Sequence, residues 1–172
     1  MDSRDPGPFV LFMGFPSKED PALVAWLALR ERVADAAGAS PGPDFAPTRD
    51  AQVDDRWLGI WRLLAPNNRE IARSAFIYGS FTSARGNVLL LKETAPEMLA
   101  ASFHGPTGGT HGWYVTVGSE LAFTCARWYE TAQLSLEAAA GAIRALGGAF
   151  VAEAPHQFPS RRRNRAVELV SK

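Results

Sequence analysis

The chain has 172 residues, of which 47% are hydrophobic and 21% charged, and its formal net charge is zero at pH 7. This composition is ordinary for a globular domain with a buried core, and it excludes wholesale disorder. No apolar run approaches the roughly eighteen residues of a membrane-spanning helix, and Cys125 is the only cysteine. We therefore expect a cytoplasmic protein without a secretory leader that folds by packing alone.

Residues 1–37 are predicted to form a strand and an amphipathic helix. The apolar run at residues 8–15 suits a buried strand. Ser17 or Asp20 can cap a helix that begins near Pro21, and Gly38 is a natural stop. Helical spacing relates the apolar residues Leu23, Trp26 and Leu27.

A Pro- and Gly-rich acidic stretch at residues 38–55 predicts an extended linker. The first strand and helix are then expected to be tethered to the following region and not continuous with it. Trp26 and Leu27 could dock on another protein at the end of this tether. The alternative is that the helix folds back onto its own sheet.

Residues 56–150 are predicted to contain two hairpin-plus-helix repeats. The stretches 57–92 and 113–146 each have an aromatic strand, a polar turn, a second strand, an aromatic bend and a helix opened by Ser or Thr. The turns fall at 66–69 and 117–120. At an offset of fifty residues, the second copy places Thr124 and Trp128 where the first has Ser74 and Tyr78, and Ser135 then corresponds to Ser83 as the residue that opens the helix.

The segments around the two copies are less regular. A short helix is predicted around Glu97, followed by a flexible glycine-rich loop at 105–112, and residues 149–151 could form a last strand. Residues 151–172 are predicted to be a basic tail. The sequence thus predicts an α+β fold in which two tandem hairpin-plus-helix repeats share an antiparallel sheet, with their helices packed on one face, beside an N-terminal strand and helix.

The order of features in the two copies resembles the YegP-like domain of unknown function, whose members often carry two units of about fifty residues in a row. The resemblance spans residues 57–146. It implies a small antiparallel sheet with helices on one face, and it brings no catalytic residues. The residues behind it are Trp61, Asn68, Ile71, Ala72, Ser74, Tyr78 and Ser83, and Trp113, Gly118, Leu121, Ala122, Thr124, Trp128 and Ser135.

His104 and His111 flank the glycine-rich loop and could suggest, with Cys125, a metal site or a nucleophile with its base. Their spacing matches no recognised ligand pattern. The loop lacks the Gly-Lys-Ser/Thr ending of a nucleotide-binding loop. We therefore predict no metal, no cofactor and no catalytic residue.

Aromatic and arginine side chains form the suggestive constellation of this sequence. If they project from an open sheet face they make a binding platform, and otherwise they fill the core. The leading prediction is a non-enzymatic protein-binding or assembly module that uses this face and flexible ends to bind another protein or a second copy. The candidate residues are Trp26, Trp57, Trp61, Arg73, Trp113, Arg127 and Trp128, with Arg161, Arg162, Arg163 and Arg165 of the tail.

Two alternatives stay open at this point. Single-stranded nucleic acid could bind the same aromatic face and the arginine-rich tail, and steep weakening by salt would identify that mode. A small metal-dependent or hydrolytic enzyme is the more distant alternative. No membrane partner is expected.

Overall fold

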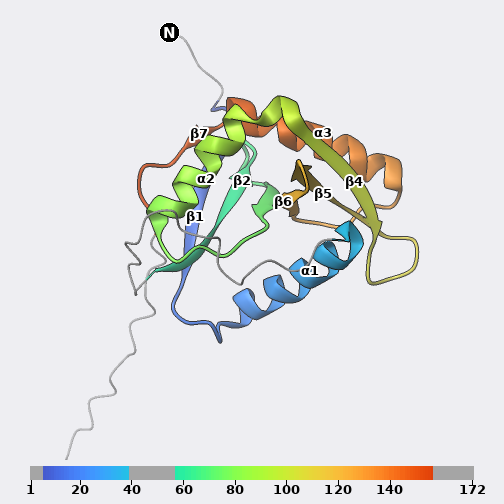
Figure 1. Ribbon diagram of the computed structural model, residues 1–172, viewed down its shortest axis with the longest axis horizontal. Helices are drawn as coiled ribbons and strands as arrows, with labels where there is room; N and C mark the ends of the chain where they lie inside the picture. Colours follow the sequence, from blue (N-terminus) through green and yellow to red (C-terminus); the bar gives the residue numbers. More distant parts are fainter. Residues whose placement is uncertain (1–5, 39–56, 157–172) are drawn as a thin grey trace, which may run out of the picture.

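The computed structural model describes residues 6–38 and 57–156, which form one open sheet with helices on both sides (Figure 1). The strand order is β4-β5-β6-β3-β2-β1-β7, and neighbours are antiparallel except for β1 and β7. The predicted α+β fold is confirmed. The strands are β1 (Phe9–Phe15), β2 (Leu58–Leu64), β3 (Glu70–Ser74), β4 (Met98–His104), β5 (His111–Val117), β6 (Glu120–Cys125) and β7 (Phe150–Val151). The helices are α1 (Pro21–Ala37), α2 (Phe81–Glu93) and α3 (Ala132–Gly148), with a 3-10 turn η1 (Ala95–Glu97).

Two units of three strands and a helix make up most of this sheet. The first unit is β1, β2, β3 and α2, and the second unit is β4, β5, β6 and α3. They join along β3 and β6, where Arg73 lies opposite Thr124. On either side of this pair, Ala72 lies opposite Cys125 and Ser74 opposite Phe123. The two units are therefore related by an approximate two-fold axis that passes between Arg73 and Thr124.

The helix N-caps and the isolated β-bridges identify which residues of the two units are equivalent. Ser80 caps α2 by accepting from the Ser83 N–H, and Thr131 caps α3 by accepting from the Leu134 N–H. Gly59 pairs with Tyr78 in the first unit as His111 pairs with Tyr129 in the second. Tyr78 thus corresponds to Tyr129. Strand β2 corresponds to β5, and Trp61 corresponds to Trp113.

The offset of fifty residues predicted for the second strand was therefore wrong by one residue, and the predicted match of Ser135 with Ser83 at the helix start was wrong by one residue in the other direction. Trp128 and Tyr129 are adjacent aromatic residues, and Thr131 and Ser135 are both able to cap a helix, so the sequence pattern fits two registers. Ser135 does not open α3. It is buried inside the helix, and its hydroxyl donates to the Ser102 hydroxyl at 2.8 Å.

Helices α2 and α3 cover one face of the sheet, and α1 lies on the other face (Figure 1). The side chains of β1 contact the helices on both faces of the sheet, because successive side chains of a strand point to opposite faces. Phe12 meets Phe81 of α2 edge-on, with ring centroids 4.9 Å apart. Phe15, on the opposite face, packs with Leu23 and Trp26 of α1.

The N-terminal strand and helix are integral parts of this architecture. β1 pairs with β2 along its full length, from Phe9 opposite Leu64 to Phe15 opposite Leu58. The expected separation of this strand from the repeats is therefore not observed. Residues 39–56, which include most of the predicted linker, lie outside the described residues.

Strand β4 was not predicted. The sequence indicated a short helix around Glu97, yet only η1 is helical, and Met98 begins a strand that pairs with β5 along seven residues. Methionine, leucine and alanine favour helices when tested alone, but tertiary pairing overrides this weak preference. The glycine-rich loop that follows connects β4 to β5, and the last two residues of the predicted loop, His111 and Gly112, belong to β5.

Candidate functional site

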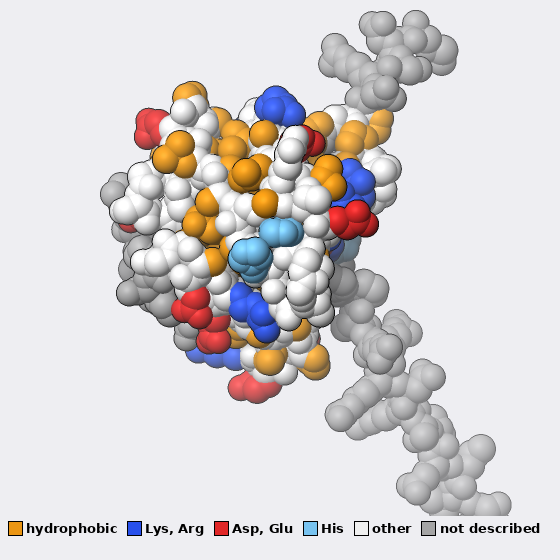
Figure 2. Space-filling model, turned by 90° about the vertical axis from the view of Figure 1, so that its right-hand side faces the viewer, with side chains coloured by type: hydrophobic (Ala, Val, Ile, Leu, Met, Phe, Trp, Pro, Cys, Tyr) orange, Lys and Arg blue, Asp and Glu red, His pale blue; other side chains and the backbone are white. Residues whose placement is uncertain are grey.

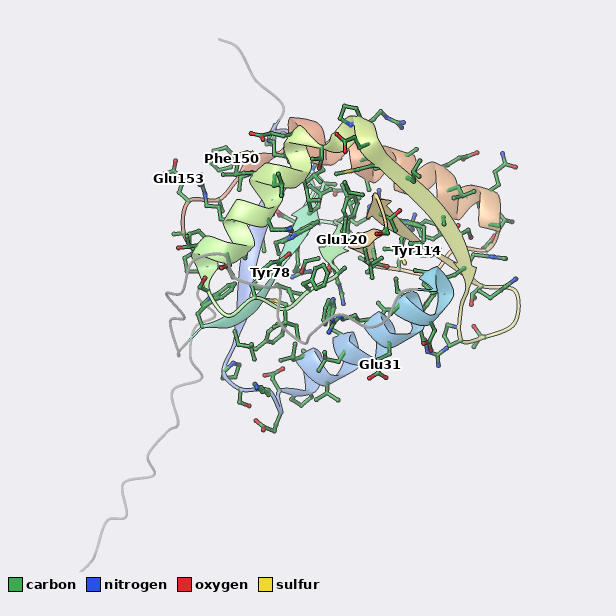
Figure 3. All side chains as sticks on the ribbon, viewed as in Figure 1. Glu31, Tyr78, Tyr114, Glu120, Phe150 and Glu153 are labelled. Carbon is green, nitrogen blue, oxygen red and sulfur yellow. The ribbon has the colours of Figure 1, made fainter. Side chains whose placement is uncertain are left out.

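Three of the predicted binding tryptophans belong to the core. Trp26, Trp61 and Trp113 are all buried. Trp61 Nε1 donates to Asn87 Oδ1 at 3.2 Å, and the same oxygen accepts from the Tyr78 hydroxyl at 2.7 Å. Burial raises the pKa of the Tyr78 phenol, which stays a neutral donor. Figure 3 shows Tyr78 inside the molecule, so these residues cannot form a surface platform.

Arg73 lies on the face of the sheet that carries α1, where it is tied to an acidic neighbour. Its Nε and one terminal nitrogen contact the Glu70 carboxylate, the second contact at 3.1 Å. Arg62 shares that carboxylate at 2.5 Å. Because its guanidinium is already paired with a carboxylate, Arg73 is less available to bind a phosphate group.

Trp57 and Trp128 are the two candidate tryptophans that keep part of their surface exposed. Trp57 lies over the cross-strand pair Gly14 and Gly59, where an added Cβ at Gly59 would come within 2.4 Å of its ring. It also meets Phe81 edge-on at 6.4 Å. It is thus packed into the first unit.

Trp128 rests on the second unit in a different way. An added Cβ would come within 3.0 Å of its ring at Gly105 and within 2.9 Å at Gly112, so the indole fills the space at these glycines together with Thr110 and Phe103, which lie closer still. Phe103 supports the ring from the side, edge-on at 5.7 Å. The indole is therefore held in place while part of it faces solvent.

The equivalent place in the first unit is closed. Trp128 corresponds to Ile77, because Tyr129 corresponds to Tyr78. Ile77 is only 3% exposed and packs with Phe15 and Ile60 under α1. The second unit has a large, partly exposed indole on two glycines where the first unit has a buried apolar cluster.

Other polar and aromatic side chains gather at the same end of the β4–β5 hairpin, where strand alternation places His104, His111 and Tyr129 on the face opposite Phe103 and Trp128. The His104 and His111 rings lie 5.1 Å apart, and Figure 2 shows histidine side chains lying together on this side of the molecule. The exposed Arg127 guanidinium stacks over the Tyr129 ring at 4.8 Å. We call this set the hairpin-end surface; it consists of His104, His111, Arg127, Trp128 and Tyr129.

Cys125 is not part of this surface. Its thiol is buried, accepts from the Trp113 N–H at 3.5 Å, and has a pKa that burial raises. A thiol with a raised pKa is a poor nucleophile. Among the described residues, no group of three or more His, Cys, Asp or Glu side chains could hold a metal ion.

A shallow hollow on α2 was not indicated by the sequence. It has a volume of about 460 Å³ and opens to solvent. Figure 3 shows Glu153 on this outer side of α2. The hollow has one acid and one base among mostly apolar neighbours, and it offers no pair of carboxylates for acid-base chemistry. Its lining consists of Phe81, Thr82, Arg85, Gly86, Leu89 and Glu153.

Two parts of the predicted binding set are thus brought together, and others are not. Arg127 and Trp128 are consecutive residues at the hairpin end, where Arg127 stacks over Tyr129 and Trp128 packs on Phe103. Arg161, Arg162, Arg163 and Arg165 lie outside the described residues. The sequence signal that could have located this surface is a pair of glycines, Gly105 and Gly112, at the two ends of the β4–β5 loop. Glycines leave space that a larger side chain from elsewhere in the chain can occupy, and Trp128 packs there.

Comparisons with family models, with curated proteins and with solved structures found no match to this chain. The YegP-like resemblance therefore stays a prediction. No helix in the described part of the chain is long and apolar enough to span a bilayer.

Proposed function

We propose that this protein is a non-enzymatic, cytoplasmic binding module that docks a protein partner on the hairpin-end surface. The observation that carries the proposal is Trp128, a partly exposed indole seated on Gly105 and Gly112 where the first unit is closed by α1. Tryptophan and arginine are the side chains that most often dominate binding energy at protein interfaces. The single, buried Cys125 is consistent with a reducing compartment.

The support of the indole favours binding as well. A side chain already held by Phe103 and two glycines loses little conformational freedom when a partner covers it. The first unit indicates what such a cover can be, because Leu23 and Trp26 of α1 close the corresponding cluster there. An amphipathic helix of a partner is the element that would fit by this comparison.

Protein is favoured over nucleic acid by the charge of this surface. Trp61 and Trp113 are buried, and Arg73 is engaged by Glu70, so the predicted stacking platform is lost. Arg127 is the one basic side chain of the hairpin-end surface. Figure 2 shows basic side chains scattered over this side of the molecule, whereas nucleic-acid sites gather them.

The test is capture of partners from native lysate on four immobilised proteins, with and without nuclease. Wild type and the control Phe150→Ala, which changes an exposed side chain at the opposite edge of the sheet, should retain the same proteins. Trp128→Ala should lose them, with affinity for a purified partner reduced about tenfold or more, as for a central interface residue. Arg127→Ala keeps the packing of the indole and should weaken the same complex.

Two results would contradict the proposal. One is equal retention by wild type and Trp128→Ala when circular dichroism shows both to be folded. The other is an eluate that disappears with nuclease and weakens steeply with salt, which would identify nucleic acid as the ligand.

A further inference from the structure

The outer edge of β4 has backbone groups that point away from the sheet. The Gly105 N–H donates to the Thr110 carbonyl across the hairpin at 2.8 Å. Because hydrogen-bonded pairs alternate along an antiparallel ladder, Leu99, Ala101 and Phe103 bond to β5. The backbone groups that point outward belong to Ala100, Ser102 and His104, together with the carbonyl of Met98, whose N–H donates to the Ala95 carbonyl.

The first unit has a cover at the corresponding edge. Carbonyl groups of Pro8, Val10 and Phe12 accept from the N–H groups of Phe150, Ala152 and His156 at 3.0, 3.0 and 2.8 Å. Phe12 lies opposite Trp61 as Ser102 lies opposite Trp113. The covered carbonyls therefore correspond to those of Met98, Ala100 and Ser102. Among the described residues, no backbone group pairs with these three on the outer side.

The uncovered edge also lacks the features that normally prevent strand addition. Proteins protect edge strands with charges, prolines, bulges or short length. β4 has seven residues, pairs with β5 without a register shift, and contains neither Asp, Glu, Lys, Arg nor Pro. Leu99 is 67% exposed on it.

We propose that β4 is a self-association edge at which a second copy of this chain adds its own β4, antiparallel, about a two-fold axis at Ala101. In this register each outward-pointing residue lies opposite another outward-pointing residue. Met98 faces His104 of the second copy, and Ala100 faces its Ser102. The two sheets become one continuous sheet.

Side chains fit the same register. Ala101 meets Ala101 of the second copy at a non-hydrogen-bonded position, where the Cα atoms approach to about 4.5 Å and small side chains suit the close contact. The exposed Leu99 lies opposite Phe103 of the second copy. Glu97 falls beside the second copy's Gly105, next to its His104, so no like charges face each other. The β3–β6 junction inside the molecule already uses such an antiparallel two-fold pairing.

The test measures the mass of the full chain by light scattering after size exclusion at several concentrations. Wild type should approach twice 18.6 kDa as concentration rises. Ala101→Glu and Ala101→Lys each place like charges opposite each other at the axis and should weaken the dimer about tenfold or more. An equimolar mixture of the two variants should restore the dimeric mass. Val24→Glu, a charge placed on an exposed apolar residue of α1, should leave it unchanged.

A second variant keeps the test decisive if the charged variants fold poorly. Ala101→Cys should form a disulfide-linked dimer under mild oxidation, since facing residues at this position are within disulfide range, and faster than a Val24→Cys control. A wild-type protein that stays monomeric at all concentrations would overturn the proposal. The same result is expected if another segment of the same chain covers β4. Dimers that persist in both single charge variants, or no faster cross-linking at Ala101, would overturn it too.

Discussion

Asn87 is the residue on which the interior of the first unit depends most directly. Its side-chain oxygen accepts from both Trp61 Nε1 and the Tyr78 hydroxyl. Trp61 and Tyr78 are almost fully buried, so neither donor has water as a substitute. One residue of α2 thus accepts hydrogen bonds from two buried donors, Trp61 and Tyr78.

Replacing this acceptor should destabilise the protein strongly. Asn87→Ala leaves two buried donors unpaired, and we expect a loss of about 2–4 kcal/mol in the free energy of unfolding. Urea denaturation followed by circular dichroism measures it. Thr82→Ala, at an exposed position of the same helix, should change stability by less than about 0.5 kcal/mol. A loss for Asn87→Ala as small as that of the control would show that the shared oxygen is dispensable.

The fate of individual tryptophans was only partly predictable from sequence. Alternation indicates that Trp61 and Leu63 share a face of β2, but it does not say which face helices cover. Here α2 and α3 cover one face and α1 the other, which leaves no open aromatic face over the central strands. Trp128 escapes because it follows β6 and sits at the hairpin end. Its seat on Gly105 and Gly112 depends on a fold that brings distant residues together.

At the scale of elements, the two helix caps are the most direct link between sequence and structure. Ser80 and Thr131 have extended backbones and accept from the N–H three residues on. Ser80→Ala and Thr131→Ala should each cost about 1 kcal/mol of stability, measured by urea denaturation. Thr131→Ser keeps the acceptor and serves as the control. Equal destabilisation by Thr131→Ser and Thr131→Ala would contradict a capping role.

The hairpins were predictable because their turns carry specific residues. Asn68 and Gly118 both adopt left-handed backbones, with φ of 62° and 61°, and these residue types tolerate that conformation best. β4 was not predictable, because Met98 to Ala101 favour helix locally. The packing of α1 on its own sheet was left open by the sequence, since an amphipathic helix does not identify which surface it will cover.

For the whole molecule, one core spans both units. The Phe123 ring lies 5.7 Å from Trp61 of the first unit and 6.0 Å from Trp113 of the second. We therefore expect the units to unfold together. Tryptophan fluorescence and far-ultraviolet circular dichroism should give one coincident urea transition. Two resolved transitions would mean that the β3–β6 junction separates independent domains.

The arrangement of the two units was predictable at this scale, whereas the sheet edges were not. Local signals placed two hairpins, each followed by a helix, within one sheet. The pairing of Phe9 with Phe150 joins residues far apart in the chain, and no local pattern encodes such a contact. The same limit applies to β4, whose exposed edge exists only because nothing in the described residues pairs with it.

The pairing of β7 with β1 also matters while the chain is being synthesised. Strand β1 leaves the ribosome before the groups that cover its outer edge, which arrive with Phe150, Ala152 and His156. Until then the described part of a nascent chain presents two uncovered edges, at β1 and at β4, and chains on neighbouring ribosomes could join through either. Pairing of β7 with β1 closes the first edge, and within residues 6–38 and 57–156 it leaves the edge of β4 open.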